Sequence, residues 1–80
     1  MKQPITIRVR DLGLAAALVS CGYEINQTCW DGGGRAYFVF LESDGLSRSV
    51  SDYWADLLVV RARKLSDNIK MLKSVIYAEK

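Results

Sequence analysis

The clearest pattern in the chain is a nearly unbroken run of apolar residues from position 12 to position 21. A helix on a protein surface keeps one polar face, so this run predicts a helix that is buried on all sides. Asp11 is the expected N-cap, because its carboxylate can accept hydrogen bonds from the first free amides of the helix. Gly22 is the expected left-handed residue that ends the helix.

Beyond Gly22 the period of the pattern changes from helical to two-fold, which indicates a strand. One face of this strand is predicted to carry Tyr23, Ile25 and Cys29, and the other face Glu24, Asn26 and Thr28. After the loop Asp31-Gly32-Gly33-Gly34, residues 35–41 are apolar at almost every position, as in a central strand or a strand covered on both faces. The two segments therefore predict an antiparallel hairpin at the centre of a sheet.

Two further segments are predicted to pack against this hairpin. Residues 5–10 alternate, with Ile5, Ile7 and Val9 facing inward and Thr6, Arg8 and Arg10 facing outward. This alternation is typical of a half-exposed first strand. After the hairpin, Ser43 or Asp44 can cap a second helix. That helix would present one apolar stripe to the sheet, made of Leu46, Val50, Tyr53 and Leu57.

The C-terminal part of the pattern predicts one short extended segment and one long helix. Residues 57–60 are apolar and partly β-branched, which favours an extended segment that can add an edge strand. From Arg61 to about Ala78 an apolar stripe recurs at helical spacing, made of Leu65, Ile69, Leu72 and Ile76. The sequence thus predicts a small single α+β domain over residues 1–80, in the order β-α-β-β-α-(β)-α, with an antiparallel sheet packed against helices.

Composition narrows the class of protein. The chain has 80 residues, half of them apolar, and a net charge of +2, which fits one globular domain and excludes a disordered chain. So small a net charge does not by itself attract nucleic acid or anionic membrane. No segment reaches the ~18 consecutive apolar residues of a membrane span, and the first residues lack the layout of a signal peptide, so we expect a cytoplasmic protein with no membrane partner. Cys21 and Cys29 are expected to be reduced and buried.

The residues that most often carry catalysis are missing. The chain contains no histidine, which removes the commonest general base and metal ligand. Its cysteines and carboxylates lack the spacing of a zinc site, so we expect neither a metal nor a cofactor. Gly32-Gly33-Gly34 lacks the ending of a phosphate-binding P-loop and is expected to be a flexible hairpin loop. Residues 35–40 do not match the RNA-recognition signature in register, so their aromatic side chains are expected in the core. We therefore expect a protein that is not an enzyme.

One feature of the hairpin indicates a protein-binding surface. Trp30 lies beside the glycine loop, and a large aromatic side chain at a hairpin tip is a typical anchor for a protein partner. The alternative is that this side chain folds back over the sheet. The candidate protein-binding set is Trp30, Gly32, Gly33, Arg35 and Trp54.

A second feature indicates an alternative site, for nucleic acid. On the last helix Arg63, Lys70 and Lys73 fall opposite the apolar stripe and form a cationic outer face. Together with Arg8 and Arg10 of the first strand they are the candidate nucleic-acid-binding residues. A charged helix face can also be no more than a solvated surface.

Several short segments, spread over nearly the whole chain, share a pattern with a known family. They are Asp11-Leu12-Gly13-Leu14-Ala15-Ala16-Ala17-Leu18, Gly22-Tyr23, Tyr37-Phe38-Val39-Phe40, Asp52-Tyr53-Trp54, Ala62-Arg63 and Leu72-Lys73-Ser74-Val75-Ile76-Tyr77. In these segments the chain resembles a family of short uncharacterised proteins, a domain of unknown function that occurs in bacteriophages, prophages and their bacterial hosts. The resemblance implies a phage-type protein and supplies no catalytic residue.

The expected function is therefore non-catalytic protein–protein binding, with a host protein as the partner. The resemblance implies an antagonist of a host defence system, such as an anti-CRISPR protein. The alternative is a small nucleic-acid-binding accessory or regulatory protein that uses the basic face of the last helix. In either case we expect a monomer or a small homo-oligomer.

Overall fold

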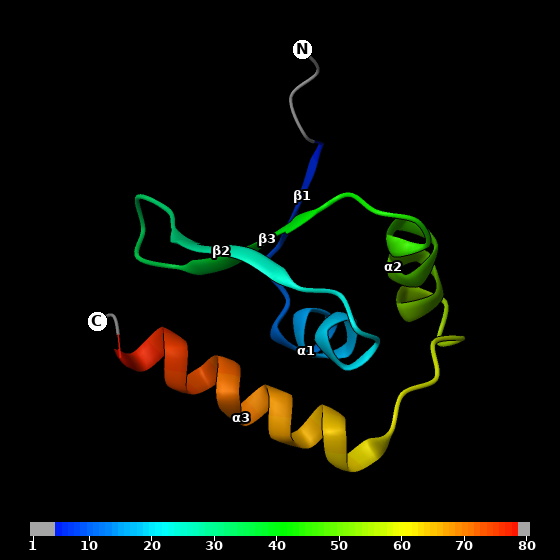
Figure 1. Cartoon of the computed structure of the whole chain (residues 1–80). Coiled ribbons are helices and arrows are strands. Elements are labelled where there is room, and N and C mark those ends of the chain that lie inside the picture. Colours follow the sequence, from blue (N-terminus) through cyan, green and yellow to red (C-terminus); the bar gives the residue numbers. More distant parts are fainter. Residues whose placement is uncertain (1–4, 79–80) are drawn as a thin grey trace.

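Residues 5–78, which the computed structural model describes, form three strands and three helices (Figure 1). In chain order these are β1 (Thr6–Val9), α1 (Leu12–Ser20), β2 (Ile25–Trp30), β3 (Ala36–Leu41), α2 (Leu46–Trp54) and α3 (Ala62–Ala78). The predicted α+β class, with an antiparallel sheet and helices packed against it, is confirmed.

The sheet has the strand order β1-β3-β2, and both outer strands are antiparallel to β3. β3 is therefore the central strand, as its continuous apolar sequence predicted. Residues 57–60 form no strand, so the predicted edge strand is wrong. The N–H groups of Leu57 and Leu58 both donate to the carbonyl oxygen of Asp52, at 2.7 and 3.1 Å, which ties this segment to the end of α2. Its apolar character has another cause, because Leu58 and Val60 line a cavity beside α1.

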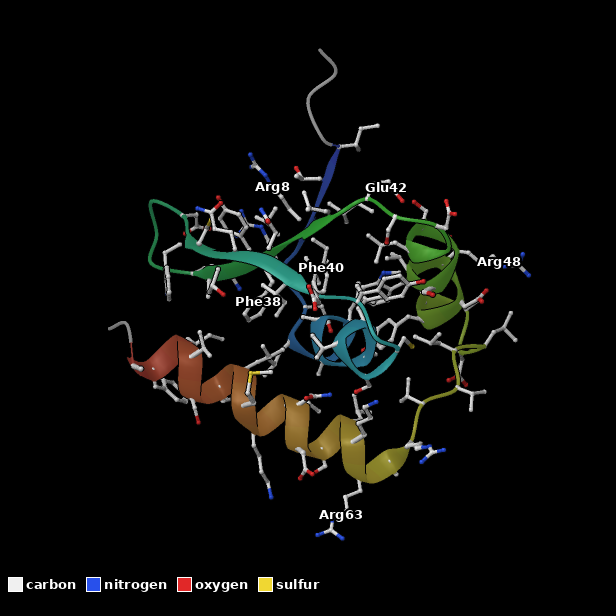
Figure 2. The ribbon with its side chains drawn as sticks, viewed as in Figure 1. Arg8, Phe38, Phe40, Glu42, Arg48 and Arg63 are labelled. Carbon is white, nitrogen blue, oxygen red and sulfur yellow. The ribbon has the colours of Figure 1, made fainter. Side chains whose placement is uncertain are left out.

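One face of the sheet forms the core together with the helices. Ile7 and Val9 of β1 lie opposite Phe40 and Phe38 of β3, and directly opposite residues of an antiparallel pair share a face. Both phenylalanines are fully buried and belong to one cluster with the apolar residues of α1 (Figure 2). α1 lies between this face and α3 (Figure 1), and its residues 14–18 are buried, as predicted.

The two ends of α1 are capped as the sequence predicted. Asp11 Oδ1 accepts a hydrogen bond from the N–H of Leu14 at 2.8 Å. Gly22 has a φ of 101°, in the left-handed region. Its N–H and that of Tyr23 donate to carbonyl oxygens of the last helical turn, at 3.0 and 3.1 Å, so the chain leaves the helix sharply and turns back toward the sheet.

α3 covers the side of α1 that faces away from the sheet. The side chains that do this include the predicted stripe of Leu65, Ile69, Leu72 and Ile76. A polar link supports the packing, since Asn68 Nδ2 donates to Ser20 Oγ at 2.9 Å and Ser20 Oγ donates to the carbonyl oxygen of Ala16 at 2.8 Å. The last helix thus holds α1 through both apolar contact and a hydrogen-bond chain.

α2 departs from its prediction at both ends. Its N-cap is Gly45 in the left-handed region, with no side-chain cap, and neither Ser43 nor Asp44 takes that place. A Cβ at position 45 would lie 2.8 Å from the hydroxyl oxygen of Tyr23, so the close approach of that ring requires glycine. At the other end Leu57 lies outside the helix and is 67% exposed, because the helix ends at Trp54. The rest of the predicted stripe packs against the core.

A β-bulge in β2 changes which side chains share a face. The register of β2 against β3 shifts between Ile25 and Gln27, which inserts one extra residue. Ile25 and Thr28 consequently both lie opposite the buried phenylalanines of β3, whereas Cys29 lies on the other face. The predicted grouping of Ile25 with Cys29 is wrong, because one inserted residue reverses the alternation. Ile5, predicted to face inward, is 69% exposed at the start of the described chain.

Replacing Gly22 by valine should lower the free energy of unfolding by about 1 kcal/mol or more, because a β-branched residue tolerates a left-handed φ poorly. For a domain of this size the melting midpoint should fall by roughly 4–8 °C per kcal/mol. A Cβ at position 22 meets no atom within 4 Å, so the cost would be conformational. Gly32→Val is the control, since position 32 is equally open but not left-handed. Equal melting midpoints for the two variants would contradict the role of Gly22.

Candidate functional site

An apolar groove of about 430 Å³ lies between β2 and α3. Figure 1 shows why it exists, since the β2–β3 hairpin and the C-terminal half of α3 both extend beyond α1 on the same side of the molecule. The groove is lined by Val19, Tyr23, Glu24, Ile25, Thr28, Met71, Leu72 and Val75. Glu24 is the one charged residue of this lining, so the groove combines apolar walls with a single negative charge.

The walls of the groove come from two elements with different chemistry. On the helix side Met71 is 42% exposed, an uncommon amount for a long apolar side chain that faces another element. On the strand side β2 is an edge strand of the described sheet, so the backbone groups along its outer edge face no neighbouring strand. The groove therefore offers both apolar contact and backbone hydrogen-bonding groups.

Trp30 lies at the end of β2, opposite Ala36, on the face of the sheet that carries the buried phenylalanines and faces the helices. It is half-buried and does not belong to the core cluster. The side chain is thus neither fully in solvent nor part of the core. It lies on the same sheet face as Ile25 and Thr28, further toward the tip of the hairpin than either.

The hairpin loop is organised by hydrogen bonds to Asp31, and its predicted flexibility stays a prediction. Asp31 Oδ1 accepts hydrogen bonds from the N–H groups of Gly33 and Arg35, at 2.9 and 3.0 Å. Asp31 Oδ2 accepts a hydrogen bond from Arg10 Nη1 at 2.7 Å, which is also an ion pair. These contacts, above all the one from the Arg35 backbone and then the one from the Arg10 side chain, hold the pKa of Asp31 below its usual value.

The candidate protein-binding residues do not form one surface. Trp30, Gly32, Gly33 and Arg35 lie together at the hairpin. Trp54 is 63% exposed at the C-terminal end of α2, where its ring meets that of Tyr53 edge-on at 5.1 Å. Figure 1 places α2 and the hairpin tip on opposite sides of the molecule. A partner bound at the hairpin would therefore not reach Trp54 through the same patch.

The candidate nucleic-acid residues are also divided between two surfaces. In Figure 2 Arg8 points away from the helices on the far side of the sheet, and Arg63 points away from the sheet on the outer side of α3. Lys70 and Lys73 are exposed residues of α3. No continuous basic surface joins the two groups in the part of the chain that is described, so nucleic-acid binding through α3 alone stays a prediction.

The face of the sheet opposite the helices carries an aromatic residue that the sequence analysis placed in the core. Tyr37 lies on this face, and the guanidinium carbons of Arg8 and Arg10 lie 5.5 and 5.2 Å from the centre of its ring. The expectation of core aromatic residues holds for Phe38 and Phe40 and is wrong for Tyr37. The alternation of side chains along β3 could have predicted this, because Tyr37 is next to Phe38 and consecutive residues of a strand face opposite sides of the sheet.

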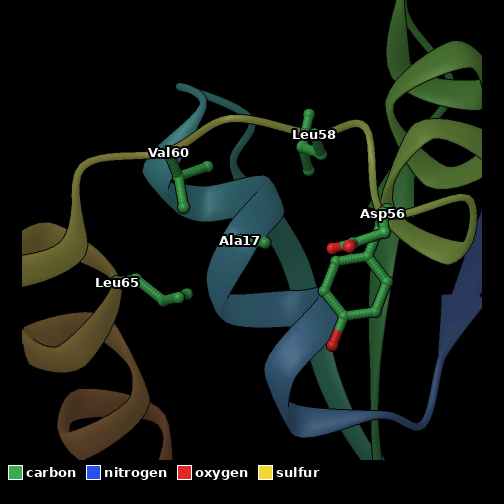
Figure 3. Close-up of a pocket in the computed structure, with 6 residues that line it drawn as sticks. Ala17, Asp56, Leu58, Val60 and Leu65 are labelled. Carbon is green, nitrogen blue, oxygen red and sulfur yellow. The ribbon is translucent and has the colours of Figure 1, made fainter.

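A second cavity, of about 320 Å³, lies under the segment that joins α2 to α3 (Figure 3). It is lined by Ala17, Tyr53, Asp56, Leu58, Val60 and Leu65. The Tyr53 hydroxyl donates to Asp11 Oδ1 at 3.4 Å, and burial, followed by the charge of Asp11, raises the pKa of Tyr53. Asp56 has a φ of 62° and ends α2 as Gly22 ends α1. Tyr53 thus contacts the cap of α1, and Asp56 makes the turn that follows α2.

The described residues contain no cluster of three or more metal-ligating side chains. Cys21 and Cys29 are both free thiols, as expected, but Cys21 is exposed, which contradicts its predicted burial, because it lies at the C-cap of α1 and not within the helix. In residues 5–78 no helix has the length and apolar character needed to cross a membrane.

Comparison with known protein families shows where the chain belongs. The family described as "Domain of unknown function (DUF5659)" has a model that matches residues 5–78. Neither a curated protein nor a solved structure matches the chain. The match covers every element of the fold and assigns no activity to any of its residues.

Because the pKa of Asp31 is lowered in the folded state, its charged form stabilises the protein above the unfolded pKa of about 3.8. This stability is lost as the pH falls through the lower, folded-state pKa. The melting midpoint of the unmodified protein should therefore exceed that of Asp31→Asn at neutral pH, and the difference should shrink as the pH is lowered from about 5 to 2. A difference that does not depend on pH would show that the charge of Asp31 is not what stabilises the loop.

Proposed function

Because the chain belongs to the DUF5659 family, whose description assigns no activity, we propose a function from its geometry. The protein is a non-catalytic binding module that holds a segment of a partner protein in the groove between β2 and α3. The observation that carries this proposal is the groove itself, an open apolar channel along an edge strand. Exposed apolar surface of this kind is typical of interaction sites.

The chemistry of the lining indicates what the groove would hold. Apolar walls favour apolar side chains, each worth about 1.5–3 kcal/mol when it is fully buried. Glu24 favours a lysine or arginine at one position of the bound segment, because a carboxylate beside a groove selects the opposite charge. The outer edge of β2 favours an extended segment, which can form main-chain hydrogen bonds along the edge strand.

Trp30 supports the proposal as an anchor. It is half-buried on the sheet face that faces α3, so a bound segment that runs from the groove toward the hairpin tip would meet its ring. Tryptophan residues in such positions often supply a large share of the binding energy of an interface. The loop beside it is held by Asp31, so Trp30 is presented on an ordered hairpin and little order would have to be gained on binding.

The kind of partner protein is also part of this proposal. The resemblance to short phage and prophage proteins supports a cytoplasmic protein that binds a host protein, for example an antagonist of CRISPR immunity. The anti-CRISPR identity can be tested by infecting cells with a phage that their CRISPR system targets, with and without expression of this protein. Restored plaque formation is expected, and unchanged plaque numbers would contradict the anti-CRISPR identity but not the groove.

The groove can be tested without a known partner. A display library of random peptides should yield extended apolar peptides that contain one basic residue. Met71→Glu, which puts a charge on the wall of the groove, should weaken the binding of these peptides by at least tenfold. Ser66→Glu is the matched control, since it makes the same charge change on an exposed position of α3 outside the groove. Equal affinities for the two variants would exclude the groove as the site.

Trp30→Ala should cost about 2 kcal/mol or more of binding energy, roughly a thirtyfold loss of affinity for the same peptides or for a host partner. Trp54→Ala is the control, because Trp54 ends α2, which Figure 1 places on the side of the molecule opposite the hairpin tip. Thermal melts of both variants must accompany the binding data. If Trp30→Ala lowers the melting midpoint sharply and leaves affinity intact, the residue is part of the fold and not an anchor.

A further inference from the structure

The face of the sheet opposite the helices is not covered by any element of the described chain (Figure 1). The register of the strands places on it Thr6, Arg8, Gln27, Cys29, Tyr37, Val39 and Leu41. Val39, in the centre, is 9% exposed, so its neighbours already shield the apolar middle of this face. Apart from Leu41, which is 43% exposed near the end of β3, what remains accessible on this face is polar and aromatic.

The arginines on this side are held in place by an aromatic ring. Arg8 and Arg10 lie two residues apart, and both guanidinium groups lie within 5.5 Å of the centre of the Tyr37 ring. Such cation–π contacts restrict side chains that are otherwise among the most mobile in proteins. A ligand that binds these groups would therefore find them already ordered, which lowers the entropic cost of binding.

The charged groups on this side are not all in ion pairs. Arg10 is paired with Asp31 at 2.7 Å. Arg8 has no carboxylate partner among the described residues, and Glu42, which is labelled on the same side of Figure 2, accepts hydrogen bonds from Ser47 at 3.1 and 3.2 Å. The exposed Arg8 guanidinium is thus outside any ion pair of the described residues, and an anionic ligand could pair with it. Charge complementarity selects an anionic ligand.

We propose that this face of the sheet, around Arg8, Tyr37 and Arg10, is a binding site for single-stranded nucleic acid. The N–H edges of the guanidinium groups bind backbone phosphates, and the outer faces of the guanidinium planes, which lie over the Tyr37 ring, stack against unpaired bases. A flat strand surface with aromatic and arginine side chains offers both kinds of contact at once. An acidic peptide would use the charge but not the planar groups, and a duplex keeps its bases stacked inside.

This site is independent of the groove, because the two occupy opposite faces of the hairpin. The side chains of β2 that line the groove, Ile25 and Thr28, lie on the helix side, whereas Cys29 lies opposite Tyr37 on the proposed site. Each site can therefore be tested while the other is left intact.

The first test measures the affinity of the protein for a fluorescent oligothymidylate and an oligouridylate at salt concentrations from about 20 to 200 mM. If two phosphates are bound, log K should fall against log salt with a slope of roughly −1.4. Arg8→Ala should weaken binding and make the slope shallower by about 0.7. Tyr37→Leu removes the ring that holds both guanidinium groups and should reduce affinity by roughly two- to thirtyfold, the range expected for loss of such cation–π contacts. Melting midpoints of both variants establish that they are folded.

Arg63→Ala is the matched control, because it removes the same charge from the opposite side of the molecule (Figure 2). Its affinity should equal that of the unmodified protein, and a duplex of the same sequence should bind more weakly than the single strand. The proposal is overturned if no binding is seen at the lowest salt, if Arg8→Ala and Arg63→Ala weaken binding equally, or if the duplex binds as tightly as the single strand.

The two thiols provide a test that needs no substitution. Cys29 lies on the proposed face, whereas Cys21 lies at the end of α1 on the helix side. Saturating oligonucleotide should slow the alkylation of Cys29, measured by mass spectrometry, and leave the alkylation of Cys21 unchanged. Equal protection of both thiols, or protection of Cys21 alone, would overturn the proposal.

Discussion

The fold depends on one constraint, which is that α1 has no polar face. Residues 14–18 of this helix are buried, so it must be covered on opposite sides at once. The sheet covers one side and α3 covers another, while α2 packs beside it. Three consecutive alanines leave room for these neighbours to come close, and the larger side chains of the core, Leu18, Phe38 and Phe40, fill the space around them.

The two proposed binding surfaces follow from this arrangement. The helices all lie on one side of the sheet, so the face that carries Tyr37 is left open. The groove results from the difference in length between two helices, because α1 has 9 residues and α3 has 17. At a rise of 1.5 Å per residue α3 is longer by roughly 12 Å, so its C-terminal turns extend past α1 and face the hairpin directly.

The sequence was informative where one local rule decides the structure. A helix without a polar face, its carboxylate cap at Asp11, its glycine stop at Gly22 and the central strand β3 were all predicted for the reasons that the structure bears out. The candidate site was predicted less well. Trp30 and the hairpin loop lie together, but Trp54 lies at the end of α2, away from the hairpin tip. The sequence did not predict this separation, because the spacing of residues within a strand or helix does not show which elements meet in space.

The failures share a physical cause, which is that short patterns are ambiguous. A single bulge residue in β2 reversed the faces of Thr28 and Cys29, and a bulge leaves no mark in an alternating sequence. In residues 57–60, Leu58 and Val60 line a cavity, whereas Leu57 and Val59 are exposed, yet the same composition is typical of a strand. Gly45 is the N-cap in place of Ser43 or Asp44, because its left-handed φ of 85° favours glycine and the hydroxyl of Tyr23 leaves little room for a Cβ there.

The cover of α1 by α3 has a consequence for the synthesis of the protein. α1 begins at Leu12 and α3 at Ala62, so about 50 residues must be added before the second side of α1 can be covered. At 5–20 residues per second the ribosome needs roughly 3–10 s for this, and during that time an apolar helix has only part of its cover. A transcript that slows translation between these helices would lengthen this interval.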